Sequence, residues 1–313
     1  MEQFNALFTS SLSTANGLLK AALDYIIQRR GKQMRPILVM LAAKSSGRIN
    51  LKCMHAACAL ELLHTASLVH DDVVDESPMR RGRKSLNAYL SNQAAVLVGD
   101  FLLSKALGHA VMTRSQRAVK VVALLGQTLA QGELEQLDNL DSEEITEAAY
   151  YDIIRKKTAS LFSDCAELGA LLSGGDKGDI ARFKGLGTLA GICFQLRDDI
   201  LDYIADDKDG KGVLGKPVGQ DMREGKLTLP VIHLAQSHPE LRDTILSIRK
   251  GRATDEQIAE IVRMVIEGDG IVYAEKTMDD FCNMTQGLLE GIRVKEMQNL
   301  LKEYISFVAG RNW

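Results

Sequence analysis

The chain has no proline between Pro78 and Pro217, although five prolines occur among its 313 residues. Proline removes a backbone donor and clashes with the preceding helical turn, so this long interval permits a succession of long helices. β-branched residues do not form alternating runs, and Asp209-Gly210 lies in a polar stretch typical of a loop, not a β-hairpin. The sequence therefore predicts an all-α protein.

Helical spacing of apolar residues is clear in three windows. They cover residues 54–76, 115–138 and 182–205. Gly174-Gly175 and the polar residues after it indicate the end of a helix and a loop. No repeat, low-complexity tract or change of composition marks a boundary. We expect residues 1–313 to form one domain, a single bundle of long helices around a central cavity.

Composition excludes several classes of protein. The chain is 46% hydrophobic and 25% charged, which excludes wholesale disorder, and its net charge of -3 argues against a dedicated nucleic-acid-binding protein. Its five scattered cysteines include no C-x-x-C pair, which argues against a disulfide framework or a zinc site. No signal peptide is recognisable, and the most apolar stretch, 94–112, contains Asp100, Lys105 and His109. We therefore expect a cytoplasmic protein without a transmembrane segment.

The first motif with chemical potential is an acidic cluster after an almost wholly apolar run, residues 60–69. Asp71, Asp72 and Asp75 form a D-D-x-x-D pattern. On a helix, Asp71 and Asp75 differ by about 40° around the axis, so their carboxylates share one face. A single motif of this kind is more often a solvated acidic helix end than a metal site.

A second acidic motif favours a metal site over a solvated helix end. Asp198, Asp199 and Asp202 repeat the same spacing 127 positions later, again at the end of an apolar helix. Two such motifs facing each other across a bundle would concentrate up to six carboxylates. Hard oxygen ligands of this kind suit Mg²⁺, which completes its shell with water and substrate phosphates. The pair therefore indicates a magnesium site for a phosphorylated substrate.

Three basic groups accompany the acidic motifs. One, at residues 80–84, follows the first acidic motif and includes Arg80 and Arg81; another contains Lys32 and Arg35. The third is a glycine-rich stretch with Lys216, followed by Lys226. Arginine forks and backbone donors at helix starts bind phosphate oxygens well. Together these groups favour two anionic ligands in one cavity, and chemistry on diphosphates.

The ordered motifs resemble those of the trans-isoprenyl diphosphate synthase family, also called polyprenyl synthetases. They are G-K-Q-M-R-P from residue 31, H-D-D-V-V-D-E-S-P-M-R-R-G from 70, K-T-A from 157, F-Q-L-R-D-D-I-L-D from 194 and G-K-P-V-G-Q-D from 215. The resemblance covers nearly the whole chain. It implies an all-α homodimer that condenses isopentenyl diphosphate head-to-tail onto an allylic diphosphate such as farnesyl diphosphate.

The resemblance also implies a role for each matching residue. The Mg²⁺ ligands would be Asp71, Asp72, Asp75, Asp198, Asp199 and Asp202. The allylic diphosphate would contact Arg80, Lys157, Lys216 and Lys226. Isopentenyl diphosphate would be held by Lys32, Arg35, His64 and Arg81. Thr158 and Gln195 would face the developing allylic cation.

The sequence also bears on the length of the product and on the alternative functions. Ala66 and Ser67 lie about one helical turn before Asp71, and small side chains there leave room for a growing chain. We expect a long product of about C35 to C45, the alternatives being a geranylgeranyl or farnesyl diphosphate synthase or a subunit of a heteromeric synthase. A class I terpene cyclase would carry a different second metal motif, and a helical scaffold would not explain the paired acids and bases.

Overall fold

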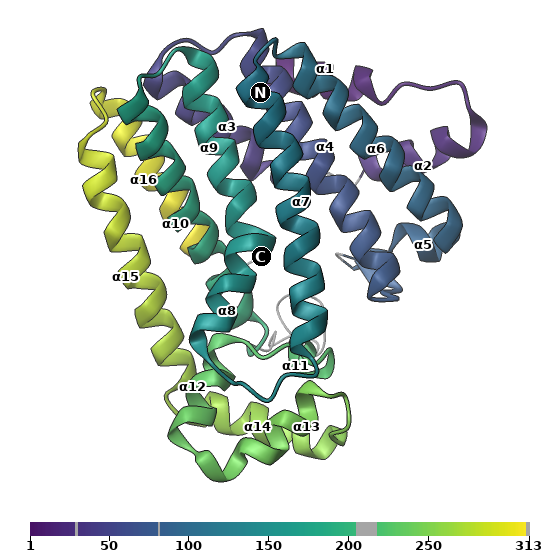
Figure 1. The fold of residues 1–313 in the computed structure, drawn as a ribbon, viewed down its shortest axis with the longest axis vertical. Coiled ribbons are helices and arrows are strands. Elements are labelled where there is room, and N and C mark those ends of the chain that lie inside the picture. The colour runs from purple at the N-terminus through teal and green to yellow at the C-terminus, as the bar shows by residue number, and fades with distance from the viewer. Residues whose placement is uncertain (29–30, 81, 205–217, 311–313) are drawn as a thin grey trace. The chain divides into compact units, whose positions relative to one another are not determined.

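The protein is all-α apart from one short hairpin (Figure 1). The computed structural model describes residues 1–28, 31–80, 82–204 and 218–310. Their backbone contacts group into two compact units. Unit 1 comprises Met1–Gln127, Leu161–Gly187 and Glu290–Leu300; unit 2 comprises Thr128–Ser160, Thr188–Leu289 and Leu301–Trp313.

Unit 1 consists of helices and the hairpin. Its elements are α1 (Glu2–Ser11), α2 (Gly17–Ile27), α3 (Met34–Ser46), α4 (Leu51–Val74), β1 (Met79–Arg80), β2 (Arg83–Lys84), α5 (Leu86–Tyr89), α6 (Asn92–Met112) and α9 (Ser160–Ser173). The antiparallel pairing of β1 and β2 sets Met79 opposite Lys84 and Arg80 opposite Arg83. α7 (Gln116–Asn139), α10 (Lys177–Leu201) and α16 (Lys295–Gly310) each contribute residues to both units.

Unit 2 carries the remaining elements. They are α8 (Glu147–Ile154), a π-helical turn η1 (Arg155–Ala159), α11 (Gln220–Arg223), α12 (Leu229–Ser237), a 3-10 turn η2 (Pro239–Leu241), α13 (Arg242–Arg249), α14 (Asp255–Glu267) and α15 (Gly270–Glu290). α14 begins with a capping box, in which the Thr254 side chain accepts the Gln257 N–H while the Gln257 side chain accepts the Thr254 N–H. This reciprocal pair satisfies two donors at the start of the helix.

The three helices expected from apolar spacing are confirmed. The windows 54–76, 115–138 and 182–205 correspond to α4, α7 and α10, although α10 begins five residues earlier, at Lys177. The predicted stop at Gly174-Gly175 is also confirmed, since α9 ends at Ser173 and Gly174 has a φ of 99°. The polar loop at 206–212 lies outside the described residues.

The packing of α4 on α6 forms the central contact of unit 1. α4 is buried on most sides, and its buried apolar residues include Leu60, Leu62 and Leu63. Near the end of α4, the His70 imidazole lies against Gly99 of α6, where any Cβ would overlap the ring. Glycine at 99 therefore permits the close approach of the two helices beside the first acidic motif.

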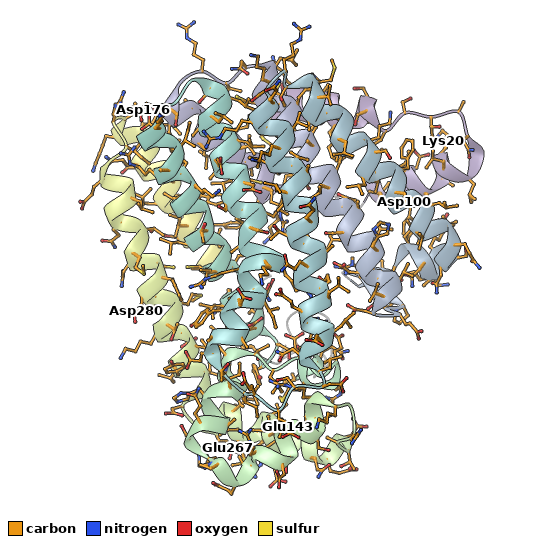
Figure 2. The ribbon with its side chains drawn as sticks, in the orientation of Figure 1. Lys20, Asp100, Glu143, Asp176, Glu267 and Asp280 are labelled. Carbon is orange, nitrogen blue, oxygen red and sulfur yellow. The ribbon has the colours of Figure 1, made fainter. Side chains whose placement is uncertain are left out.

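α6 is the one helix in the described part of the chain that is long and apolar enough to cross a membrane by length and composition. Its buried residues, which include Ala95, Leu102 and Ala106, give it the character of a core helix on one side. The charged Asp100 side chain projects from the same helix and is 61% exposed (Figure 2).

The carboxyl group of Asp164, on α9, has an unusually high pKa. Burial and the nearby Glu167 charge raise its pKa to about 7, although Lys184 acts in the opposite direction. The folded protein therefore binds a proton that the unfolded chain releases at lower pH. Stability from this group is greatest below the unfolded pKa and decreases as pH rises to about 7.

We accordingly expect Asp164→Asn to stabilise the protein at pH 8 by about 1–2 kcal/mol, and this gain to vanish near pH 4. Urea unfolding of both proteins across this pH range measures the difference. Asp280→Asn, at an exposed position on α15, provides the control and should show no such pH-dependent difference. A gain for Asp164→Asn that is equal at pH 4 and pH 8 would contradict the raised pKa.

Candidate active site

The first acidic motif lies at the C-terminal end of α4. Asp72 is buried, Asp71 is half-buried and Asp75 is exposed. The helix ends at Val74, four residues before Pro78, so Asp75 forms its C-cap. The Asp75 N–H still donates to the Asp71 carbonyl at 2.8 Å, which continues the helical bonding pattern. The predicted sharing of one face by Asp71 and Asp75 therefore fits the last helical turn.

Arg80 is a basic residue that the structure places directly against this motif. Its Nε donates to Asp72 Oδ1 at 2.7 Å, while the Asn87 side chain donates to the Asp72 backbone carbonyl at 3.1 Å. Arg80 stands in β1, just before the hairpin turn at Gly82, where φ is 72°. A guanidinium held beside the buried Asp72 carboxylate is well placed to bind an anion that approaches this motif.

The other predicted residues of unit 1 lie on or next to α3 and α4. Lys32 is exposed and precedes α3, whereas Arg35 is in its first turn with its guanidinium 5.0 Å from the centre of the Phe162 ring. Half-buried His64 is in the middle of α4 and accepts, through its carbonyl, the Ser67 hydroxyl at 2.9 Å. Ala66 is only 2% exposed.

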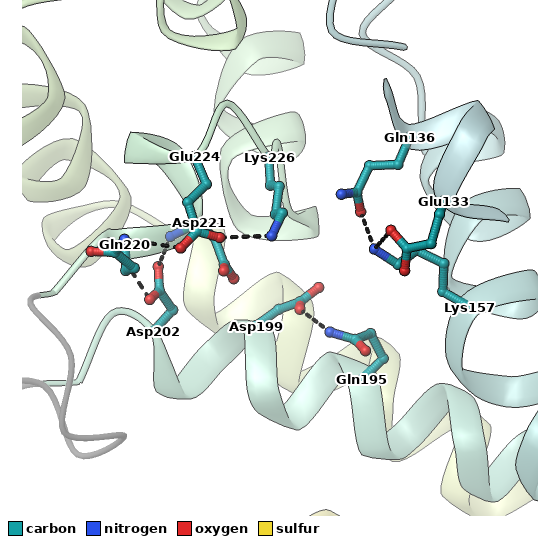
Figure 3. A network of polar contacts seen from close by, with 10 residues as sticks. All are labelled: Glu133, Gln136, Lys157, Gln195, Asp199, Asp202, Gln220, Asp221, Glu224 and Lys226. Carbon is teal, nitrogen blue, oxygen red and sulfur yellow. Dashed lines mark hydrogen bonds and ion pairs between the residues drawn. The ribbon is translucent and has the colours of Figure 1, made fainter. Parts of the chain in front are cut away.

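The second acidic motif lies at the end of α10 in unit 2. Asp199 is buried and accepts the Tyr150 hydroxyl at 2.5 Å. It also accepts the Gln195 side-chain amide at 2.8 Å (Figure 3). Burial raises the pKa of Asp199 well above its usual value, and the charges of Asp221 and Asp198 raise it further. A bound cation would relieve this unfavourable concentration of negative charge.

Asp202 has a different environment from Asp199. Its two carboxylate oxygens accept the backbone N–H groups of Gln220 and Asp221, each at 3.2 Å, at the start of α11 (Figure 3). Its backbone carbonyl accepts the Gly219 N–H at 2.9 Å. Asp202 therefore fixes the start of α11, whereas Asp199 is bonded to side-chain donors.

Lys157 and Thr158 lie in the π-helical turn η1, a type of distortion that is frequent at functional sites. Lys157 Nζ contacts Glu133 at 2.7 Å and Gln136 at 2.8 Å on α7, and Thr158 Oγ1 donates to Gln195 Oε1 at 2.7 Å. Gly132 makes this arrangement possible, because a Cβ there would come within 2.9 Å of the Lys156 and Lys157 side chains.

Several of these side chains line a cavity of about 190 Å³ in unit 2. Five of the residues predicted for the site contribute to it: Lys157, Thr158, Gln195, Asp199 and Lys226. Lys226 is held by Glu224 at 2.6 Å. The wall also includes Asp221, the last residue of the G-K-P-V-G-Q-D motif, and Tyr150 and Arg249, which the sequence analysis did not identify. Arg249 donates to the carbonyls of Ser142 and Glu144, at 3.0 and 2.6 Å, and so supports the wall.

Two predicted residues, Arg81 and Lys216, lie outside the described residues. Among the residues that are described, no three acidic, histidine or cysteine side chains converge as metal ligands. The donor set nevertheless fits Mg²⁺, since both motifs offer only carboxylate oxygens. The charge around Asp199 supports the same conclusion, because Asp198 and Asp221 disfavour its ionised form.

Tyr150 is expected to act as a positioning residue for Asp199. Replacing it with phenylalanine removes the hydroxyl donor while keeping the buried ring, and should lower kcat about tenfold and raise the Mg²⁺ concentration needed for half-maximal rate. Steady-state rates at graded Mg²⁺ measure both effects. Tyr151→Phe, at the next position of α8, provides the control. An unchanged Mg²⁺ dependence in Tyr150→Phe would contradict this role.

Comparison of the sequence with family models and with known proteins points to one family. Residues 16–265 match the family model described as Polyprenyl synthetase. The chain is 39% identical over 316 residues to the octaprenyl diphosphate synthase of Haemophilus influenzae, covering 100% of this chain and 94% of that protein.

Two solved structures share the fold over almost their entire length. The geranylgeranyl pyrophosphate synthase of Bacteroides thetaiotaomicron is 38% identical with a TM-score of 0.86, covering 99% of this chain and 95% of that chain. A polyprenyl synthase of Caulobacter crescentus, solved with calcium and isoprenyl diphosphate, is 31% identical with a TM-score of 0.92, covering 100% and 95%.

Proposed function

Because this chain belongs to the polyprenyl synthetase family and is a prenyltransferase, we propose that it is a long-chain trans-polyprenyl diphosphate synthase. It adds isopentenyl diphosphate units head-to-tail to an allylic diphosphate such as farnesyl diphosphate, to a length of about C35 to C45, with residues 1–313 acting as one polyprenyl synthetase domain. The observation that carries the proposal is the cavity of unit 2, where Lys157, Lys226, Asp199 of the second acidic motif and the Thr158–Gln195 pair come together.

The basic residues bind the two diphosphates in this proposal. Arg80, Lys157, Lys216 and Lys226 hold the allylic diphosphate, and Lys32, Arg35, His64 and Arg81 hold isopentenyl diphosphate. The partners that Arg80, Lys157 and Lys226 have in the structure, Asp72, Glu133 and Glu224, keep each cationic head in a defined position. Preorganised cations stabilise the charge that develops on a departing diphosphate.

The acidic motifs bind magnesium. Asp71, Asp72, Asp75, Asp198 and Asp199 would hold Mg²⁺, which when bound neutralises the negative charge of a diphosphate. Asp202 would hold the metal as well, while its two oxygens also accept backbone N–H groups and so fix the start of α11. The calcium and isoprenyl diphosphate bound to the related polyprenyl synthase support a divalent cation beside the substrate.

The reaction needs no nucleophilic side chain. The carbon–oxygen bond of the allylic diphosphate breaks and leaves an allylic cation, which Thr158 and Gln195 face with their oxygen atoms. The double bond of isopentenyl diphosphate attacks this cation and forms the new carbon–carbon bond. The released diphosphate then takes the proton that is lost, and the product is an allylic diphosphate longer by one unit.

Incubating the purified protein with farnesyl diphosphate, labelled isopentenyl diphosphate and Mg²⁺ tests the proposal directly. We expect a ladder of products that ends at one long chain. A stop at fifteen or twenty carbons would instead favour a shorter-chain synthase, the activity named for the Bacteroides relative. No extension by folded protein would indicate a subunit that requires a partner.

We also propose that the enzyme is a cytoplasmic homodimer. All five cysteines are free thiols, as expected in a reducing compartment. The exposed side of α6 carries apolar side chains that a second copy could cover: Val96, Leu97, Leu107, Val111 and Met112. Cross-chain burial of such a surface is typical of stable dimers.

Introducing a charge on this surface should separate the subunits. Leu97 is 68% exposed, and Leu97→Glu is expected to convert the dimer to a folded monomer in light scattering coupled to size-exclusion chromatography. Leu18→Glu on α2, where leucine is 61% exposed, is the matched control and should remain dimeric. A Leu97→Glu protein that is still dimeric would rule out α6 as the interface.

A further inference from the structure

Two cysteines from distant parts of the sequence meet in unit 2. The Sγ atoms of Cys193 on α10 and Cys282 on α15 are 3.2 Å apart, although 89 positions separate the residues. Cys193 is fully buried, and its thiol is 3.7 Å from the Met278 carbonyl. Cys282 is only half-buried. The pair therefore has one partly exposed cysteine and one that is shielded from solvent.

The two thiols also differ in acidity. The hydrogen bond with Cys193 lowers the pKa of Cys282, even though burial and the Asp279 charge oppose this shift. The same hydrogen bond, together with burial, raises the pKa of Cys193. A thiolate therefore forms first on the more accessible sulfur, and the thiolate is the reactive species in thiol–disulfide exchange.

We propose that Cys193 and Cys282 form a reversible thiol–disulfide site, with Cys282 as the attacking sulfur. The Cys282 thiolate attacks a low-molecular-weight disulfide such as oxidised glutathione, forms a mixed disulfide and releases one glutathione thiolate. Cys193 then gives up its proton, attacks Cys282 Sγ and displaces the second glutathione. Two protein thiols are oxidised to one disulfide, and one glutathione disulfide is reduced to two thiols.

Closing this bond requires a limited movement. The sulfur atoms must approach from 3.2 Å to the disulfide bond length of about 2.05 Å. Flexible cysteine side chains and small shifts of α10 and α15 can supply this change. The other three cysteines, Cys53, Cys58 and Cys165, are fully buried in unit 1, so reagents cannot reach them as they reach Cys282.

The test exposes the folded, full-length protein to glutathione buffers of graded ratio, then quenches with acid, alkylates the remaining thiols and maps them by mass spectrometry. In oxidising buffer we expect one disulfide joining Cys193 to Cys282, and its loss when reduced glutathione is restored in excess. Five alkylated cysteines after oxidation, or a disulfide between other residues, would overturn the proposal. The readout is independent of prenyl transfer, so its result does not depend on the proposed function.

Two variants separate the roles of the sulfurs. Cys193→Ser should stop at a mixed disulfide with glutathione on Cys282, because the resolving thiol is missing. Cys282→Ser should acquire no glutathione, because Cys193 is buried. Cys53→Ala, which alters a cysteine of α4, is the control and should form the same disulfide as the original protein. Glutathione on Cys193 in the Cys282→Ser protein would contradict the assigned order of attack.

Discussion

Replacing Asp71 with asparagine is expected to lower the rate of prenyl transfer about 10²–10³-fold while the protein stays folded. Asparagine has nearly the same size as aspartate but removes the negative charge that we propose binds Mg²⁺. Asp71 is half-buried in the last turn of α4, and its backbone carbonyl, which the substitution keeps, accepts the Asp75 N–H. The change therefore affects ligation far more than helix structure.

Initial rates at saturating substrates and graded Mg²⁺ measure this effect, and thermal unfolding verifies the fold. Asp280→Asn is a suitable control, since Asp280 points outward from α15 in unit 2 (Figure 2). It should retain full activity. If Asp71→Asn kept more than about half of the original rate, the first acidic motif would not be part of the metal-binding machinery.

The main helices could be predicted because their determinants are local. The proline-free interval and the apolar spacing lead directly to α7 and α10, and the Gly174-Gly175 pair gives the end of α9. The window predicted for α4 extended to residue 76, two residues past the observed end of the helix at Val74. The chain leaves the helix earlier, and Asp75 caps it while Ser77 donates to the Asp72 carbonyl.

The two acidic motifs have identical spacing but different surroundings, and spacing alone does not reveal this. Asp72 is paired with the charged Arg80, only eight positions away in the chain. Asp199 instead accepts a neutral tyrosine hydroxyl, Tyr150, which lies 49 positions earlier. Only the folding of α8 against α10 brings these two side chains together. The contribution of Tyr150 could therefore not be predicted from the sequence.

The π-helical turn at Lys157 and Thr158 is a further feature without a local signal. Its sequence, Arg-Lys-Lys-Thr-Ala, is compatible with an ordinary helix. The turn coincides with the close approach that Gly132 of α7 allows, and with the bond from Thr158 to Gln195. These contacts join residues about 25 to 37 positions apart, so the distortion depends on tertiary packing.

Product length should respond strongly to side-chain size on α4. Ala66 and Ser67 precede Asp71 by about one turn, so a chain that grows from a diphosphate bound at the acidic motif would extend past them. Replacing both residues with phenylalanine is expected to shorten the product from a long chain to roughly C15–C20, because two rings would fill the space about one turn, 5.4 Å, below the carboxylates. Chromatography of the dephosphorylated products resolves each chain length.

Variants at these two positions distinguish a role in setting product length from a role in helix packing alone. Ala66 is 2% exposed, so a ring there also costs about 1–3 kcal/mol of stability by overpacking, whereas half-buried Ser67 tolerates a larger side chain better. Ser67→Phe alone should therefore shorten the product with little loss of stability, and Ser67→Ala should leave its length unchanged. An unaltered ladder from a folded double variant would show that small residues at 66 and 67 serve only the packing of α4.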